Sequence, residues 1–293
     1  MYNEIVKNIS KTIIGNSEKI KLSLAAIISE GSILIEDSPG SGKTTFAKSV
    51  THNLGFSFKR IQFTSDLLPS DILGFNIFSD DKLSFQKGPI FTNIVLADEL
   101  NRGSPKSQSA FLEAMEEKNV SIDGVTYNLP EPFFVIATQN PMDSSGTSTL
   151  PDSQLDRFMI SFSLSELDDK EKIMMLKNDI SFNDNKSNTI NWDELKIKKT
   201  KVNLSDEIYK YLIEIEQTIQ SLDQKIYISS RCLKQIIDIA KGWAIVHEKD
   251  YVTHQDIKDT LPYILRHRIK FLKQDEKFNF VKKEILEKIT IKK

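Results

Sequence analysis

The chain has 293 residues, of which 39% are hydrophobic and 27% charged, a composition typical of a folded globular protein and not of a disordered one. Lysine and arginine number 39 against 41 aspartate and glutamate residues, and this near balance argues against extensive binding along nucleic acid or an anionic membrane. The single cysteine, Cys232, excludes an intramolecular disulfide and makes a cysteine-based zinc site unexpected, and no apolar run approaches the roughly 18 residues that span a membrane.

The first half of the chain alternates short apolar runs with stretches of helical pattern. Residues 1–4 show no basic segment ahead of an apolar core, so we expect no secretory signal and a cytoplasmic protein. Polar or turn residues follow each apolar run, which is typical of buried parallel strands. The runs are Ser32–Glu36, Ile61–Phe63, Asn93–Ala97, Phe133–Thr138 and Met159–Phe162. With a helix predicted at Lys106–Lys118, the alternation predicts an α/β fold with helices on both faces of a sheet.

The second half of the chain has helical patterns and no further strand-like runs. Helices are predicted at Glu166–Asn178, Ser205–Leu222, Ser230–Glu248 and Thr253–Phe271, with a loop at Ser181–Asn188. The tail from Lys270 is lysine-rich and amphipathic, and we expect a solvated terminal helix there. We therefore predict an α/β nucleotide-binding domain at residues 1–165 and a helical domain at residues 166–293.

A turn cluster follows the first predicted strand and reads Asp-Ser-Pro-Gly-Ser-Gly-Lys-Thr from Asp37 to Thr44. It opens a helix predicted at Thr45–Val50, which is the context that a phosphate-binding loop requires. Glycines let backbone N–H groups turn towards phosphate oxygens, and the helix N-terminus adds partial positive charge. Asp37 stands where the motif has glycine, and on this loop alone a structural turn stays open. The predicted nucleotide-binding residues are Ser38, Pro39, Gly40, Ser41, Gly42, Lys43, Thr44 and Thr45.

Individual roles follow from the chemistry of ATP hydrolysis. Lys43 is expected to reach the β- and γ-phosphates, and the hydroxyl of Thr44 to coordinate Mg²⁺. The third apolar run ends in Asp98 and Glu99, an acidic pair of the Walker B type. Asp98 is expected to help hold Mg²⁺ through water, and Glu99 to polarise the attacking water. Taken alone, the pair is also compatible with solvated acids at an ordinary strand end.

The fourth run ends in Ala-Thr-Gln-Asn-Pro, which places a polar amide at Asn140. We predict that Asn140 orients the water against the γ-phosphate, although Asn-Pro is also a common turn. Ligands of open α/β sheets bind at the carboxyl ends of the strands, so Lys43, Asp98 and Asn140 are expected at one edge of the sheet.

The motifs together closely resemble those of the MoxR family of AAA+ ATPases, from about Gly15 to Arg268. The resemblance is carried by Arg60–Asp71, Gly88–Phe91, Ala97–Arg102, Pro132–Pro141 and Leu155–Phe158. Aspartate occurs in that family at the position of Asp37. The resemblance implies a P-loop AAA+ core with strand order 5-1-4-3-2, a C-terminal all-α lid, and ATP with Mg²⁺ as ligands. It also implies a homo-oligomer, a hexameric ring, with ATP at the subunit interfaces.

Two arginines take roles that the resemblance implies. Arg157 matches the arginine finger, which acts on the ATP of the neighbouring subunit; the alternative is a surface arginine that pairs with Asp152 or Asp156. Arg231 matches the second sensor of the lid, which contacts the γ-phosphate and couples nucleotide state to lid angle. Its alternative is an arginine at a helix start that makes no nucleotide contact.

Residues 64–87 and 118–130 match two insertions of the family, an insert in helix 2 and a hairpin before the first sensor. Asp123-Gly124 has the composition of a hairpin turn. Both segments either face the ring pore or a client, or pack between subunits.

Three hypotheses for function follow. The first is a MoxR-type ATPase that remodels or matures partner complexes, with von Willebrand factor A-domain proteins as partners that the resemblance suggests and with an unidentified protein client. The second is a nucleic-acid motor, against which the balanced charge argues. The third is a nucleotide-binding scaffold without turnover, against which Glu99, Asn140 and Arg157 argue.

Overall fold

The computed structural model describes residues 2–38, 40–79, 82–140, 150–164, 167–177, 191–223 and 226–289. Two predictions lie outside these residues, namely the role of Pro39 in the phosphate-binding loop and the loop at residues 181–188.

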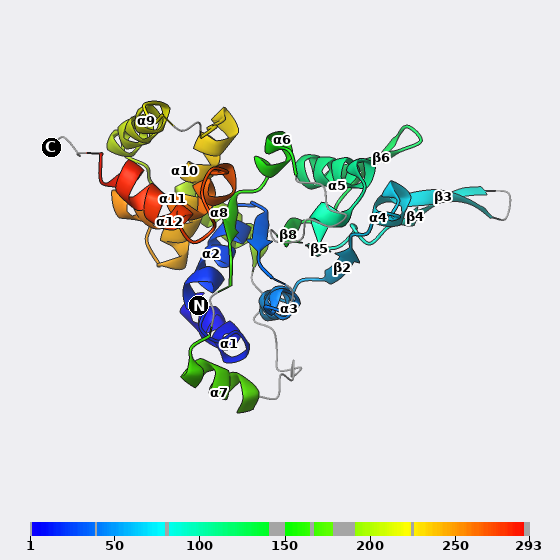
Figure 1. The fold of residues 1–293 in the computed structure, drawn as a ribbon. Coiled ribbons are helices and arrows are strands. Elements are labelled where there is room, and N and C mark those ends of the chain that lie inside the picture. Colours follow the sequence, from blue (N-terminus) through cyan, green and yellow to red (C-terminus); the bar gives the residue numbers. More distant parts are fainter. Residues whose placement is uncertain are drawn as a thin grey trace.

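Five strands form one parallel sheet at the centre of the molecule (Figure 1). They are β1 (Ile33–Glu36), β2 (Phe58–Gln62), β5 (Ile94–Asp98), β8 (Phe134–Gln139) and β9 (Ile160–Phe162). Their order across the sheet is β2-β5-β8-β1-β9, and every neighbouring pair is parallel. Numbered one to five along the chain, the strands follow the order 5-1-4-3-2, so the predicted order is confirmed.

The edge strand β2 differs most from its predicted position. The apolar run predicted a strand at Ile61–Phe63, whereas the strand begins at Phe58 and ends at Gln62. Lys59 and Arg60 are exposed because β2 lies at the edge of the sheet, with β5 on one side. An edge strand of this kind has no continuous apolar run, so the sequence pattern marked only its end.

Helices cover both faces of the sheet, as predicted. Successive residues of a strand point to opposite faces. On one face Ile33 and Ile35 join an apolar cluster with α1 (Tyr2–Thr12), α2 (Ser17–Ile28) and α3 (Lys43–Leu54). On the other face Leu34 and Val95 join a second cluster with α5 (Pro105–Glu117). Helices α1 and α2, together with α8 (Trp192–Lys201), were not among the predicted elements.

Two hairpins extend from the sheet on the side away from the helical domain (Figure 1). Residues 64–87 contain α4 (Pro69–Leu73), β3 (Gly74–Ser79) and β4 (Lys82–Lys87), and residues 118–130 contain β6 (Asn119–Ile122) and β7 (Val125–Asn128). The predicted turn at Asp123-Gly124 joins β6 to β7, and both residues have positive φ. The hairpins touch each other, because Asn76 Nδ2 donates to Asp123 Oδ2 at 2.6 Å and the rings of Phe85 and Tyr127 stack with centroids 4.2 Å apart.

The C-terminal part of the chain is helical. Its helices are α7 (Asp169–Lys177), α8, α9 (Asp206–Gln220), α10 (Ser230–Val246), α11 (His254–Leu265) and α12 (Lys277–Phe280). Helix α10 packs closely on α2 of the α/β domain: a Cβ on Gly242 would lie 2.3 Å from the backbone oxygen of Ala25, so only glycine fits there. No helix among the described residues is long and apolar enough to cross a membrane.

Two predictions for the C-terminal part were wrong. The helix predicted at Thr253–Phe271 ends at Leu265, is followed by a 3-10 turn at Arg266–Arg268, and leads to Ile269, which is buried in an extended conformation. The tail is not a solvated terminal helix. A π-helical turn at Val281–Leu286 follows α12, and Val281 and Ile285 are fully buried in the same apolar cluster as Ile33 and Ile35 of β1.

Candidate nucleotide-binding site

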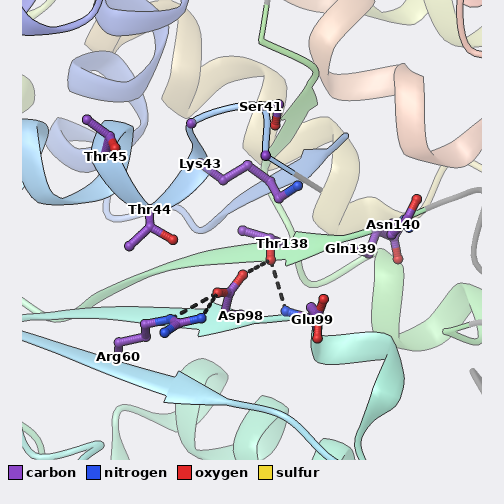
Figure 2. Close-up of a pocket in the computed structure, with 12 residues that line it drawn as sticks. Ser41, Lys43, Thr44, Thr45, Arg60, Asp98, Glu99, Thr138, Gln139 and Asn140 are labelled. Atoms are coloured by element: carbon purple, nitrogen blue, oxygen red, sulfur yellow. Dashed lines mark hydrogen bonds and ion pairs between the residues drawn. The ribbon is translucent and has the colours of Figure 1, made fainter. Parts of the chain in front are cut away.

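A cavity of about 400 Å³ opens at the carboxyl ends of β1, β5 and β8 (Figure 2). This is the edge at which open α/β sheets bind ligands. The cavity brings together the phosphate-binding loop, both acidic residues of β5 and the candidate sensor on β8. It is lined by Gly40, Ser41, Gly42, Lys43, Thr44, Thr45, Arg60, Asp98, Glu99, Thr138, Gln139 and Asn140.

The loop between β1 and α3 is built for an anion. Gly40 and Gly42 have φ of 81° and 89°, a region that favours glycine, and nothing lies within 4 Å of a Cβ built on either. Gly42 is the N-cap of the twelve-residue helix α3 and, as glycine, has no side chain with which to cap the first N–H groups. Uncapped N–H groups at a helix N-terminus bind phosphate oxygens. Lys43 Nζ donates to the backbone oxygens of Asp37 and Ser38, at 3.0 and 2.6 Å, so its ammonium group lies against the loop.

Asp37, which replaces the first glycine of the motif, has a specific place in this loop. Its Oδ1 accepts the N–H of Ser38 at 2.8 Å, and its Oδ2 accepts the N–H of Leu164 at 3.2 Å. Leu164 lies just after β9, on the chain that leads to the helical domain. The aspartate therefore closes the start of the loop and ties it to a segment 127 residues further along.

Asp98 and Glu99 are fixed by a neighbouring strand (Figure 2). The hydroxyl of Thr138 on β8 donates to Asp98 Oδ1 at 2.6 Å and accepts the backbone N–H of Glu99 at 2.9 Å. Glu99 has a φ of 54°, which is uncommon for a residue with a side chain and places it just beyond β5. The threonine hydroxyl holds this backbone, so the two carboxylates leave the end of β5 in defined directions.

Two residues of β2 contact these carboxylates. Arg60 donates from Nε and Nη2 to Asp98 Oδ2, at 2.9 and 2.6 Å. Gln62 Nε2 donates to Glu99 Oε2 at 2.8 Å, and Arg102 Nη1 lies 3.2 Å from the same oxygen. Arg60, Gln62 and Thr138 were not among the predicted site residues. The sequence does hold a signal for Arg60 and Gln62, because polar residues two positions apart on a strand lie on the same face of the sheet.

The donor set suits Mg²⁺ only in the company of a nucleotide. Thr44 and Asp98, the predicted metal residues, both line the cavity and offer a hydroxyl and carboxylate oxygens. Among the described residues, no group of three or more histidine, cysteine, aspartate or glutamate residues could hold a metal ion. Mg²⁺ commonly keeps several waters and combines one or two protein oxygens with substrate phosphates. The residues present therefore fit an Mg²⁺ ion that arrives with phosphate groups.

The two predicted arginines lie elsewhere and lie together. Neither Arg157 nor Arg231 lines the cavity. Arg157 Nε is 3.1 Å from Glu116 Oε2, while Nη2 of Arg231 contacts the other oxygen of the same carboxylate. Arg157 thus pairs with Glu116 on α5, and not with Asp152 or Asp156 as the alternative interpretation had it. Arg231 lies next to Arg157 because both contact Glu116. The roles of both arginines stay predictions.

A buried polar cluster lies behind these arginines and joins the two parts of the chain. Asp156 Oδ1 accepts from Arg268 Nη2 at 2.9 Å, and its Oδ2 accepts from the hydroxyl of Ser229, the N-cap of α10, at 2.7 Å. Burial, together with the neighbouring charge of Arg268, lowers the pKa of His267 well below its ordinary value, so this imidazole is neutral. The cluster holds the start of α10 against the α/β domain.

A parallel sheet with a phosphate-binding loop after β1 and an acidic pair after a neighbouring strand defines a P-loop NTPase, and the strand order with a helical C-terminal part defines its AAA+ class. Residues 32–160 match the family described as "ATPase family associated with various cellular activities (AAA)", and residues 216–289 match the AAA lid domain.

Individual relatives narrow the class further. The chain is 39% identical over 299 residues to the uncharacterized protein YeaC of Bacillus subtilis, covering 98% of this chain and 92% of that protein. It is 32% identical over 276 residues to the chaperone MoxR1 of Mycobacterium tuberculosis, covering 89% and 73%. The crystal structure of a candidate ATPase from Cytophaga hutchinsonii superposes with a TM-score of 0.86 at 34% identity, covering 99% and 94%. The chain belongs to the MoxR family of AAA+ ATPases.

Proposed function

We propose that this protein hydrolyses ATP with Mg²⁺ in the cavity at the carboxyl edge of the sheet. The observation that carries the proposal is the convergence of Lys43, Asp98 and Glu99 on that one cavity, from a loop and a strand more than fifty residues apart. A phosphate group on the loop would lie between the ammonium of Lys43 and the carboxylate that activates water. A structural turn or a solvated strand end does not account for this convergence.

The roles of the residues follow from the geometry. The N–H groups at the start of α3 bind phosphate oxygens, and Lys43 exchanges its loop carbonyls for the β- and γ-phosphates. Thr44 and Asp98 would hold Mg²⁺, which would neutralise charge at those phosphates. Glu99 polarises the attacking water and Asn140 orients it. Water adds to the γ-phosphorus, the bond to the bridging oxygen breaks, and ADP and phosphate leave.

We further propose that turnover takes place between subunits of a ring, most simply a hexamer. Supporting this, Arg157 lies outside the cavity of its own subunit and contacts Glu116 through Nε, at 3.1 Å from Oε2. Arg231 lies on the same carboxylate. Two guanidinium groups held side by side outside their own cavity suit the phosphates of a neighbour's ATP. On this proposal residues 1–165 carry the nucleotide and residues 166–293 form the lid.

The biological role that we propose is remodelling or maturation of partner protein complexes. It rests on family membership and on the relative named chaperone MoxR1. A von Willebrand factor A-domain partner, a protein client and a cytoplasmic location stay predictions. An action on nucleic acid is not favoured, since lysine and arginine do not exceed aspartate and glutamate, and stimulation of hydrolysis by DNA would revive it.

Two variants test the proposed chemistry, and we expect them to differ. Lys43→Ala should abolish ATP binding in calorimetry, because the ammonium that balances the phosphates is lost. Glu99→Gln should bind ATP normally but lower phosphate release by about a hundredfold or more, the range for loss of a general base. Normal phosphate release by Glu99→Gln, or unchanged ATP affinity of Lys43→Ala, would contradict the assignment. Crosslinked Glu99→Gln, loaded with ATP, can then be searched for a client that Lys43→Ala does not retain.

A further inference from the structure

Arg60 occupies a position at the nucleotide cavity that the proposed chemistry does not use. It lies on β2, lines the cavity, and points its guanidinium at Asp98 (Figure 2). Its Nε and Nη2 lie 2.9 and 2.6 Å from Asp98 Oδ2. Hydrogen bonds between two charged groups, as here, are roughly twice as strong as those between neutral groups. The carboxylate assigned to the metal is thus already bound to a cation of the protein itself.

The environment of Asp98 explains why an arginine lies against it. The Asp98 side chain is only 9% exposed, and its other oxygen, Oδ1, is taken by the hydroxyl of Thr138. A buried carboxylate without a counter-charge is costly. Arg60 supplies that charge at the one oxygen that Thr138 leaves open. A divalent cation that bound Asp98 Oδ2 would have to displace this guanidinium.

Arg60 is also able to move away from Asp98. Its side chain is 47% exposed, in contrast to the carboxylate that it contacts. The next residue on the same face of β2, Gln62, offers its side-chain oxygen to Arg60 Nη2, so the guanidinium has a second partner beside the cavity. Phosphate groups on the loop would bring negative charge to the same space, which favours a guanidinium that turns away from Asp98 and towards them.

We propose that Arg60 is an internal counter-ion of the metal site: it occupies Asp98 in the nucleotide-free protein and excludes a divalent cation until a nucleotide brings one. The inference rests on the proposed function in one respect, namely the assignment of Asp98 to the metal. Binding of nucleotide with its metal is then an exchange of cations on one carboxylate. The consequence is an order of binding, in which the metal enters with the phosphates and not before them.

The test uses Mn²⁺ alone as the probe, titrated into the nucleotide-free protein and followed by the electron paramagnetic resonance signal of unbound Mn²⁺. We expect Arg60→Met to bind Mn²⁺ at least about tenfold more tightly than the wild type, because a unit charge in contact with the site is removed. Lys59→Met is the matched control, since it removes one exposed charge from the same strand without touching Asp98. It should bind Mn²⁺ as the wild type does.

Two further measurements make the outcome decisive. The gain in Mn²⁺ affinity should vanish when Arg60→Met is combined with Asp98→Asn. The difference in Mn²⁺ affinity between Arg60→Met and the wild type should shrink when a non-hydrolysable ATP analogue is present. Equal Mn²⁺ affinity of Arg60→Met and wild type, or a gain that survives Asp98→Asn, would overturn the inference. If Arg60→Met does not fold, Arg60→Gln replaces it; this variant also removes the charge, so the same gain is expected, and no gain overturns the inference. Failure of the wild type to bind ATP would overturn the proposed function but not this result, because the titration contains no nucleotide.

Discussion

The arginine–carboxylate pairs in the nucleotide cavity and around Glu116 differ in the burial of their partners. In the nucleotide cavity the acid is buried and the arginine exposed: the exposed fraction of the side chain is 9% for Asp98 and 47% for Arg60. Around Glu116 all three side chains are partly exposed, at 30% for the acid, 28% for Arg157 and 41% for Arg231. Partly exposed ion pairs are weak and exchange readily. The difference indicates that the buried Asp98 depends on its counter-ion, whereas the partly exposed pair of Arg157 with Glu116 can exchange for another anion.

The largest expected effect lies with Arg157. Arg157→Ala should keep ATP binding and lower turnover by roughly a thousandfold, the scale for loss of an arginine finger. If the arginine acts on the neighbour's nucleotide, mixing the inactive Arg157→Ala and Glu99→Gln proteins should restore part of the activity. An Arg157→Ala subunit then has an intact cavity, and its Glu99→Gln neighbour supplies the arginine. Phosphate release of the mixture measures this.

The control for that mixture is Glu99→Gln with Lys43→Ala. Each of these variants carries its defect in its own nucleotide cavity, so no subunit of this mixture has an intact cavity. Mixing should therefore restore much less activity. Full activity of Arg157→Ala alone would refute the assignment. Absence of any recovery in the first mixture would show that Arg157 acts within its own subunit, and the comparison between the two regions would then fail.

An intermediate effect is expected at Asp156, which tests the distinction between buried and exposed pairs. Asp156→Asn keeps the volume but leaves Arg268, only 4% exposed, without its carboxylate. Loss of one partner of a buried pair costs about 3 kcal/mol or more of stability. Chemical denaturation should show this loss. Asp152→Asn is the matched control, because its pair with Lys270 is more than half exposed on both sides and should contribute less than about 1 kcal/mol. Equal losses in the two variants would contradict the distinction.

The smallest effect is expected at Glu116. Glu116→Gln keeps the length of the side chain but removes the charge that both arginines share. Such partly exposed pairs contribute about 1 kcal/mol, so we expect turnover to fall by roughly fivefold or less, with little change in stability. Glu117→Gln, at the next and exposed position, is the control. A loss as large as that of Arg157→Ala would mean that Glu116 belongs to the catalytic machinery itself.

The central fold was predictable because fully buried parallel strands appear in the sequence as short continuous apolar runs. The predicted position of the edge strand β2 was shifted along the chain, because Lys59 and Arg60 interrupt its apolar pattern. Helix α1 was overlooked although Ile5, Val6 and Ile9 mark a buried face. Helix α8 has little signal to find, because Leu195 is its only buried residue.

The candidate site was predictable where it depends on strand ends and not where it depends on neighbours across the sheet. The phosphate-binding loop, Asp98, Glu99 and Asn140 converge because adjacent parallel strands end at one edge. The predicted strand order already placed β2 and β8 beside β5, but the contacts of Arg60 and Thr138 depend on the register of these pairs, which was not predicted. Glu116 and Arg231 are in contact although they lie 115 positions apart, so no local sequence pattern indicates this contact.

The bond from Asp37 to Leu164 has a mechanical consequence. A glycine at position 37 would give the loop freedom, but it could not reach the chain beyond β9. With aspartate there, the loop that holds phosphate and the segment that leads to the helical domain share a single carboxylate. A displacement of the loop would therefore act on Leu164 through this carboxylate, a connection that glycine at position 37 could not provide.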